Sequence, residues 1–184
     1  FSNSKDHEWK QQLFLELALD HIHPACMILS PVNAINSNNL FRIAHQASVP
    51  AICFQRPSRS RFVDYYVGGD GYDQGFMQME YVAQRLKRRG TVLLLEGDPY
   101  NDNALNIANG HQASLAQYDG RIRAITVPVM LWSKDESKQI VSEMLASGTK
   151  LDAIIAGSDQ MAEGAIEILE QHQSTGKIIV VGGD

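Results

Sequence analysis

Several short segments of this chain are apolar at almost every position, and they limit its fold more than any other feature. The clearest are residues 91–96 (TVLLLE), 151–156 (LDAIIA) and 177–181 (KIIVV). A strand with one face in water alternates apolar and polar residues, whereas a strand buried on both faces is a continuous apolar run. Segments with helical spacing separate these runs. The pattern therefore predicts a doubly wound α/β fold, in which helices cover both faces of parallel sheets.

The expected elements alternate along the chain. Trp9, Leu13 and Leu17 recur at a spacing of four, which is typical of a helix. Similar patterns predict helices at residues 8–21, 40–47, 72–86, 102–118, 134–145 and 159–171. The expected strands are residues 27–29, 51–54, 62–67, 91–96, 121–127, 152–156 and 177–181.

The strongest interruption of this pattern is Gly68-Gly69-Asp70-Gly71. Three glycines in four residues permit backbone angles that other residues resist. We therefore expect the chain to pass from one lobe to another here. Residues 1–68 would form part of an N-terminal lobe, and residues 69–184 would form most of a C-terminal lobe.

Composition and charge exclude several classes of function. The net charge of −5 disfavours nucleic acid as a partner, because contacts to phosphates need a basic face. The basic run at residues 85–89 precedes Gly90 and is interpreted as a solvated helix end that complements the helix dipole. No run of 18 apolar residues occurs, so we expect no insertion into a membrane.

The residue types that carry out chemistry show no arrangement typical of an enzyme. The six histidines have no metal-ligand spacing, and residues 68–71 do not match a dinucleotide-binding motif. No spacing demands an acid/base pair. Cys26 and Cys53 are each expected in a strand and are interpreted as buried free thiols, with a disulfide between them as the alternative. We therefore expect no catalysis, no metal and no cofactor.

Polar side chains instead follow the expected strands, where the loops of a parallel sheet share its carboxyl edge. A guanidinium, an amide and a carboxylate together offer donors and acceptors for adjacent hydroxyl groups, and a tryptophan face stacks on the C–H face of a pyranose. These loops predict the binding of a polyhydroxylated small molecule. The candidate ligand-binding residues are Gln55, Arg56, Asn103, Trp132, Ser158, Asp159 and Asp184.

Most of these residues also have a purely structural interpretation. Ser158 is equally suited to capping a helix, as are Asn101 and Asp102 in the loop before Asn103. An aspartate near a helix N-terminus, such as Asp159, is favourable without a ligand. Arg56 could be a surface arginine, and Trp132 could pack in the core or at a hinge.

Three segments resemble one known family. They are VPAICFQRP at 49–57, GDPYNDNALNIANG at 97–110, and LDAIIAGSDQMAEGAIEIL with GKIIVVGGD at 151–184. Each is similar to a segment of the periplasmic sugar-binding proteins of the ribose/xylose type (type I), whose ligand domain is shared with the lactose-repressor family. Aligned through these segments, nearly the whole chain resembles the family in the same order.

The resemblance implies site residues at Gln55, Arg56, Asn103, Trp132, Ser158 and Asp184. This chain departs from the family pattern at three positions. Gln55 stands where Asp is usual, Ser158 where Asn is usual, and Leu105 where ribose binders present an arginine. The departures leave the sugar unassigned.

The resemblance also implies two Rossmann-like lobes joined by a hinge, incomplete at both ends of this segment, with the first β-α-β unit absent before Phe1. The implied function is a periplasmic receptor that delivers a sugar to an ABC transporter permease. The alternatives are the sensing domain of a membrane-bound kinase or cyclase, and the effector domain of a transcription regulator. In each case we expect Arg56, Trp132 and Asp184 to face one ligand.

Overall fold

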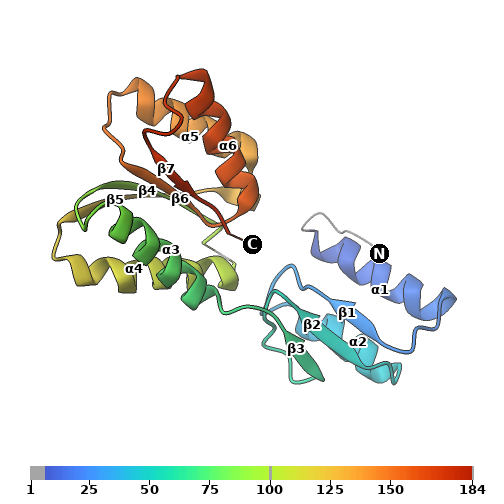
Figure 1. Ribbon diagram of the computed structural model, residues 1–184. Helices are drawn as coiled ribbons and strands as arrows, with labels where there is room; N and C mark the ends of the chain where they lie inside the picture. Colours follow the sequence, from blue (N-terminus) through green and yellow to red (C-terminus); the bar gives the residue numbers. More distant parts are fainter. Residues whose placement is uncertain (1–6, 100, 184) are drawn as a thin grey trace. The chain divides into compact units, whose positions relative to one another are not determined.

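The computed structural model describes residues 7–99 and 101–183. By its contacts the chain divides into two units. Unit one comprises residues 1–69 with 101–103, and unit two comprises residues 70–100 with 104–184. Figure 1 shows the elements of each unit in sequence colours.

Unit one is a small parallel sheet with two helices. Its strands lie in the order β1-β2-β3 and are all parallel. Leu15, Phe41 and Cys53 lie in the core where both helices meet the sheet. The elements are α1 (Glu8–His21), β1 (Met27–Leu29), α2 (Asn38–Gln46), β2 (Ala51–Phe54) and β3 (Tyr65–Val67).

The two faces of the unit-one sheet differ in burial. Leu29, Ala51 and Cys53 face the helices and are buried, whereas Ile28 and Tyr65, which follow the opposite alternation, are each 67% exposed. The apolar run at 27–29 predicts a short buried strand. That expectation is wrong for this sheet within the described residues, because α1 and α2 pack into a single core with one face.

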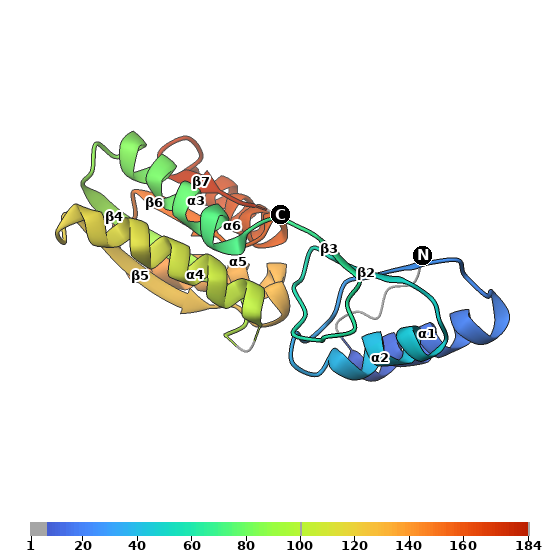
Figure 2. The ribbon, with the colours of Figure 1, turned by 90° about the horizontal axis from the view of Figure 1, so that it is seen from below.

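Unit two is a four-stranded parallel sheet in the order β5-β4-β6-β7. Figures 1 and 2 show α3 and α4 on one face of this sheet and α5 and α6 on the other. The elements are α3 (Gly71–Arg85), β4 (Gly90–Glu96), α4 (Asp102–Leu115), β5 (Ile122–Pro128), α5 (Lys134–Ala146), β6 (Ala153–Ala156), α6 (Asp159–Gln171) and β7 (Ile179–Val181).

Strand β4 lies at the centre of unit two and is buried on both faces. Val92 and Leu94 pack with α3, while Leu93 and Leu95 pack with α5 and α6. All four of these side chains are 0% exposed. The predicted parallel α/β fold is therefore confirmed.

Some element boundaries and one cysteine differ from the sequence-based expectation. Strand β3 begins only at Tyr65, and α4 ends at Leu115, after which residues 116–118 form a 3-10 helix. Cys26 lies outside β1 and is exposed, so the prediction of two buried thiols is wrong for it. Burial raises the pKa of the Cys53 thiol to about 11.

None of the glycines at residues 68–71 has a positive φ, and Gly68 has a neighbouring side chain that leaves no room for a Cβ. A Cβ at Gly68 would overlap the Tyr66 ring. Asp70 caps α3, because its Oδ1 accepts from the Tyr72 amide at 2.8 Å. The freedom that these glycines have to adopt left-handed angles is therefore not used here.

Helices α3 and α4 approach each other closely at two glycines. A Cβ at Gly75 would overlap the carbonyl of Ile107, and a Cβ at Gly110 would overlap the carbonyl of Tyr72. The neighbouring atoms are backbone, so they cannot move aside as a flexible side chain could. Glycine at these positions permits the contact between the two helices.

Gly110→Ala should destabilise unit two, although alanine normally favours a helix by roughly 0.5–1 kcal/mol over glycine. The added methyl group has no room, and overpacking costs about 1–3 kcal/mol. Urea denaturation measures the change, with Gly69→Ala as the control, because a Cβ at Gly69 meets nothing within 4 Å. A Gly110→Ala variant as stable as the parent would contradict the helix contact described above.

Helices α5 and α6 are joined by surface ion pairs. Lys134 Nζ lies 2.7 Å from one carboxylate oxygen of Glu167, and Lys138 Nζ lies 2.5 Å from the other. Hydrogen bonds from Lys134 and then Lys138 lower the pKa of Glu167 to about 2. The folded state therefore favours the ionised carboxylate.

A group whose folded pKa is lowered stabilises the fold above its unfolded pKa, about 4.3 for glutamate, and loses this effect as pH falls through the folded value. Glu167→Gln should therefore lower the melting temperature slightly near neutral pH, and the difference should vanish as pH approaches 2. Melting curves at low salt test this, with exposed Glu170→Gln as the control. A difference that persists unchanged at low pH would contradict the ion-pair explanation.

Candidate functional site

The strands of unit two all end at one edge of their sheet, and several predicted ligand residues lie along it. The parallel pairing of β4 with β5 and β6 places Pro128 beside Glu96, and Ala156 beside Leu95. Trp132, Ser158 and Asp159 follow these strand ends. The structure thus brings three of the predicted residues to one edge.

Trp132 lies across the ends of β4 and β6. A Cβ at Gly97 would overlap the Trp132 ring, and a Cβ at Gly157 would lie 3.0 Å from it. The ring is half-buried and packs against the core of the α5/α6 face. Glycine at positions 97 and 157 is therefore what allows an indole to cover this edge.

A strained turn holds Trp132 in place. Leu131 and Trp132 have φ values of 52° and 56°, in the left-handed region that costs an ordinary residue roughly 1–2 kcal/mol. Ser133 caps α5 by accepting from the Glu136 amide at 3.2 Å, and the Glu136 carboxylate accepts from the Met130 amide at 2.9 Å. These bonds fix both ends of the turn.

Ser158 and Asp159 differ in their freedom to meet a ligand. Ser158 is only 6% exposed, and its Oγ accepts from the Met161 amide at 3.4 Å as the cap of α6. Asp159 is exposed, and its Oδ1 would lie 2.6 Å from a Cβ at Gly182. Ser158 therefore has a structural role, while Asp159 has a carboxylate beside the end of β7.

The loop before α4 also contains a cap. Asn101 Oδ1 accepts from the Asn103 amide at 2.9 Å, so Asn101 serves the capping role for which Asn101 and Asp102 were both candidates. The Asn103 side chain is half-buried. Residues 101–103 group with unit one by their contacts.

The edge of the unit-one sheet carries Gln55 and Arg56 directly after β2. Gln55 has a φ of 62°, its amide donates to the Val67 carbonyl at 2.8 Å, and its carbonyl accepts from the Tyr66 hydroxyl at 3.1 Å. The Arg56 amide donates to the Phe54 carbonyl at 2.7 Å. The backbone at Gln55 and Arg56 is thus bonded to β3 and to the end of β2, while Gln55 is exposed and Arg56 half-buried. The remaining predicted residue, Asp184, lies outside the described residues.

Gln55 and Trp132 have a positive φ, unlike most residues other than glycine in the described part of the chain. In the described part of the chain, nine residues other than glycine have a positive φ. Six of them follow helix ends, where such a conformation commonly terminates a helix: His23, Ser48, Lys87, Arg88, Asp119 and Gln173. Gln55 instead follows strand β2, while Leu131 and Trp132 lie in the short 3-10 helix Met130–Trp132 between β5 and α5.

Sequence reasoning missed a buried polar trio at the end of β4. Gln78, Glu96 and His111 are 7%, 6% and 0% exposed. Nδ1 of His111 lies 2.9 Å from Glu96 Oε1, and its Nε2 lies 2.9 Å from Gln78 Oε1. The sequence did contain one sign of this trio. Glu96 is a charged residue in an otherwise apolar strand, and it lies on the same face as Val92 and Leu94.

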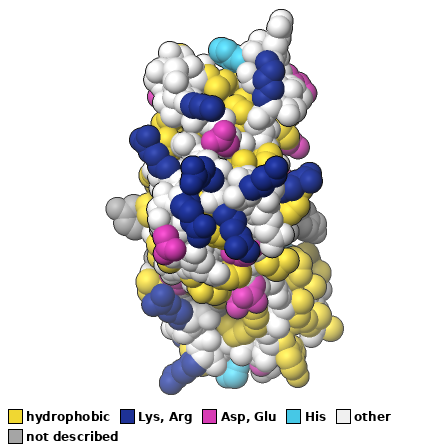
Figure 3. Space-filling model, turned by 60° about the vertical axis from the view of Figure 1, so that its left-hand side comes forward, with side chains coloured by type: hydrophobic (Ala, Val, Ile, Leu, Met, Phe, Trp, Pro, Cys, Tyr) yellow, Lys and Arg dark blue, Asp and Glu magenta, His cyan; other side chains and the backbone are white. Residues whose placement is uncertain are grey.

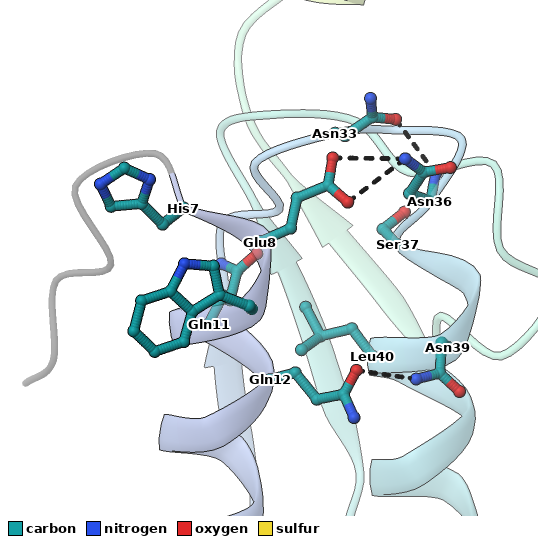
Figure 4. Close-up of a pocket in the computed structure, with 10 residues that line it drawn as sticks. His7, Glu8, Gln11, Gln12, Asn33, Asn36, Ser37, Asn39 and Leu40 are labelled. Carbon is teal, nitrogen blue, oxygen red and sulfur yellow. Dashed lines mark hydrogen bonds between the residues drawn. The ribbon is translucent and has the colours of Figure 1, made fainter.

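A hollow of about 490 Å³ in unit one is separate from the predicted residues. Figure 4 shows it between the start of α1 and the start of α2. Its polar side chains are already bonded to one another, since Asn36 Nδ2 donates to Glu8 at 3.2 Å and Asn39 Nδ2 donates to Gln12 at 3.0 Å. None of the predicted ligand residues lines it.

Basic side chains gather on another surface of the molecule (Figure 3). The exposed run that ends α3, residues 85–89, adjoins the start of β5, because the Gly90 amide donates to the Arg121 carbonyl at 3.2 Å. This is the amino edge of the unit-two sheet. The basic run therefore lies at the opposite edge from Trp132.

Within residues 7–99 and 101–183, no three side chains among His, Cys, Asp and Glu lie together as a metal site. In the same residues, none of the helices has the length and hydropathy needed to cross a bilayer.

Curated proteins similar to this chain are solute-binding proteins. The D-xylose-binding periplasmic protein of Escherichia coli is 25% identical over 162 residues, which cover 86% of this chain and 49% of that protein. The xylitol-binding protein of Mycolicibacterium smegmatis is 24% identical over 84% of this chain and 44% of its own length. The chain thus spans about half the length of these relatives.

Solved structures agree on the fold. A periplasmic solute-binding protein of an ABC transporter from Actinobacillus succinogenes, with bound D-allose, matches 98% of this chain and 65% of its own at a TM-score of 0.88 and 22% identity. The fructose-binding periplasmic domain of a hybrid two-component system matches 96% of this chain and 58% of its own at a TM-score of 0.85 and 25% identity.

The model of the periplasmic binding protein domain family matches residues 10–184, nearly the whole chain. Its parallel strand order and the structural matches agree with the type I form of that fold. The chain belongs to the periplasmic binding protein family.

Proposed function

We propose that this chain is the ligand-binding part of a periplasmic receptor for a sugar or a similar polyhydroxylated molecule, which it delivers to an ABC transporter permease. Relatives named for D-xylose, xylitol and ribose support the ligand class. The members of the family that it matches are binding proteins, and we infer that this chain likewise binds without chemical conversion of its ligand.

The observation that carries the proposal is the strained backbone at two predicted ligand residues. Gln55 adopts a left-handed angle directly after β2, and Trp132 adopts one at the end of the short 3-10 helix Met130–Trp132 that follows β5. Such strain persists when the surrounding structure imposes it, and it clusters at binding sites. It supports a role for both residues in holding a ligand.

Unit two supplies the apolar contact in this proposal. The Trp132 indole, held over Gly97 and Gly157, is a rigid flat surface at the carboxyl edge. One face of a pyranose presents C–H groups, which pack well on such a surface. Asp159 on the same edge, and Asp184 beyond Gly183, would accept hydrogen bonds from the hydroxyl groups.

Unit one supplies the donors. The Arg56 guanidinium offers a planar fork of N–H groups, and the Gln55 amide offers both a donor and an acceptor. With Asn103 they would offer donors to the hydroxyl groups of a ligand. Ser158 is the weakest of the predicted residues, because its hydroxyl already caps α6.

A sensing role is the second candidate. The match to the fructose-binding periplasmic domain of a hybrid two-component system favours it over the transcription-regulator alternative. The two roles use the same ligand contacts and differ in the partner. Uptake of labelled sugar in cells with and without the gene separates them, since loss of uptake indicates transport and unchanged uptake with altered gene expression indicates sensing.

Arg56→Ala and Trp132→Ala should each weaken sugar binding in the whole protein. For Arg56→Ala, the loss of a hydrogen bond to a charged group costs about 1.5–3 kcal/mol, which is roughly ten- to a hundredfold in affinity. A thermal-shift screen of D-xylose, D-ribose, D-allose and xylitol identifies the ligand, because a ligand of the native state raises the melting temperature. Calorimetry then measures the affinity of each variant.

Exposed Arg123 on β5 provides the matched control, and Arg123→Ala should bind as tightly as the parent. Trp132→Phe keeps an aromatic face and should lose less affinity than Trp132→Ala. If both alanine variants bind as tightly as the parent, the site lies elsewhere. If none of the sugars changes the melting temperature, the proposed ligand class is wrong.

A further inference from the structure

Gln78 of α3, Glu96 of β4 and His111 of α4 form a buried polar network, called here the 78–96–111 network. It lies at the end of β4, above the apolar side chains Val92 and Leu94 on the same face. Packing alone would favour apolar residues at these positions, because a buried polar group is costly unless it is fully bonded. The network therefore calls for a function other than filling space.

The amide of Gln78 has one orientation that satisfies its surroundings. Its Nε2 lies 3.3 Å from the Ala156 carbonyl and 3.0 Å from the Gly182 carbonyl, and only the NH₂ group can donate to both. Its Oε1 consequently faces His111 Nε2 at 2.9 Å. That oxygen only accepts, so His111 carries a hydrogen on Nε2.

The other ring nitrogen of His111 is hydrogen-bonded to Glu96. Nδ1 and Glu96 Oε1 are 2.9 Å apart. Each of these two atoms is the hydrogen-bond partner of the other in this contact. Glu96 Oε2 is the buried side-chain oxygen without a hydrogen-bond partner among the described residues. Truncating either partner would thus leave the other unpaired in the interior.

The network holds three strand ends at the carboxyl edge of unit two. Glu96 ends β4 and precedes Gly97, on which Trp132 lies. Ala156 ends β6, and Gly182 follows β7. Through Gln78, the backbone carbonyls of Ala156 and Gly182 are bonded to α3, and through His111 the end of β4 is bonded to α4.

We propose that Gln78, Glu96 and His111 are positioning residues, which fix the strand ends of unit two in the geometry that ligand binding requires. Their effect on affinity rests on the proposed function, whereas their effect on the backbone does not. The hydrogen bonds of Gln78 and His111 can all form in only one arrangement, so they select one position for each strand end.

Gln78→Met tests the positioning role, because methionine fills a similar volume but cannot donate to Ala156 and Gly182. Hydrogen exchange should become at least about tenfold faster in segments 156–158 and 181–183, as local opening becomes easier. Exchange in the first half of β5, residues 122–125, which pair with residues 90–93 of β4 away from the network, should stay within about twofold of the parent. Gln84→Met, an exposed change on the same helix, should alter none of these segments.

The partnership of His111 with Glu96 is tested by His111→Leu, Glu96→Leu and the double variant. Each single change leaves a buried group unpaired and should lower the melting temperature, while the double variant should recover part of the loss. Independent packing roles predict instead that the two losses add.

D-xylose is the probe for affinity, measured by calorimetry on the whole protein. Gln78→Met should weaken its binding at least about tenfold, with the Gln84→Met control unchanged. If the parent does not bind D-xylose, exchange alone decides the positioning role. Exchange that is unchanged, or that rises equally in residues 122–125 of β5, would overturn the proposal and leave the network a structural element only.

Discussion

Burial of β4 on both faces is the constraint on which the rest of unit two depends. Its residues 92–95 are fully buried, and each such side chain contributes about 1.5–3 kcal/mol when removed from water. A strand buried in this way needs a helix layer on each face, and short α/β connections then make its neighbours parallel. Parallel strands all end at one edge. The position of the candidate site therefore follows from the burial of a single strand.

That edge is held more rigidly than loops usually are. Trp132 is fixed by a left-handed turn, by the capping bonds of Ser133 and Glu136, and by two glycines whose missing side chains make room for the ring. The 78–96–111 network bonds the same edge from beneath. A site built on strand ends with such support binds its ligand with less loss of conformational freedom.

Much of the fold was predictable from the sequence, because apolar runs and helical spacing report burial directly. The predicted bounds of α1 match the structure at both ends. The parallel arrangement of both sheets was also predicted. The short β3 was overestimated because Phe62 and Val63 are apolar yet pack against the unit-one core from a loop. The apolar character of residues 62–63 does not distinguish a strand from a loop that packs against the core.

The site was predictable in position but less so in detail. Strand-end residues such as Gln55 and Trp132 stand out in the sequence, whereas the left-handed backbone that distinguishes them depends on tertiary contacts. Ser158 could not be separated from a helix cap without its hydrogen bond to Met161. The His111–Glu96 contact joins residues 15 apart through two different elements, so spacing gave no sign of it.

The central claim is that Trp132 contacts a bound sugar, and its own fluorescence tests this most directly. The chain has two tryptophans, so Trp9→Phe leaves Trp132 as the sole indole emitter. Any further tryptophan of the whole protein is replaced by phenylalanine in the same way. Titration of this variant with the sugar found by thermal shift should then change the Trp132 emission until it saturates, over the concentrations at which calorimetry detects binding. A sugar that binds by calorimetry but leaves the Trp132 emission unchanged in intensity and wavelength would contradict the account.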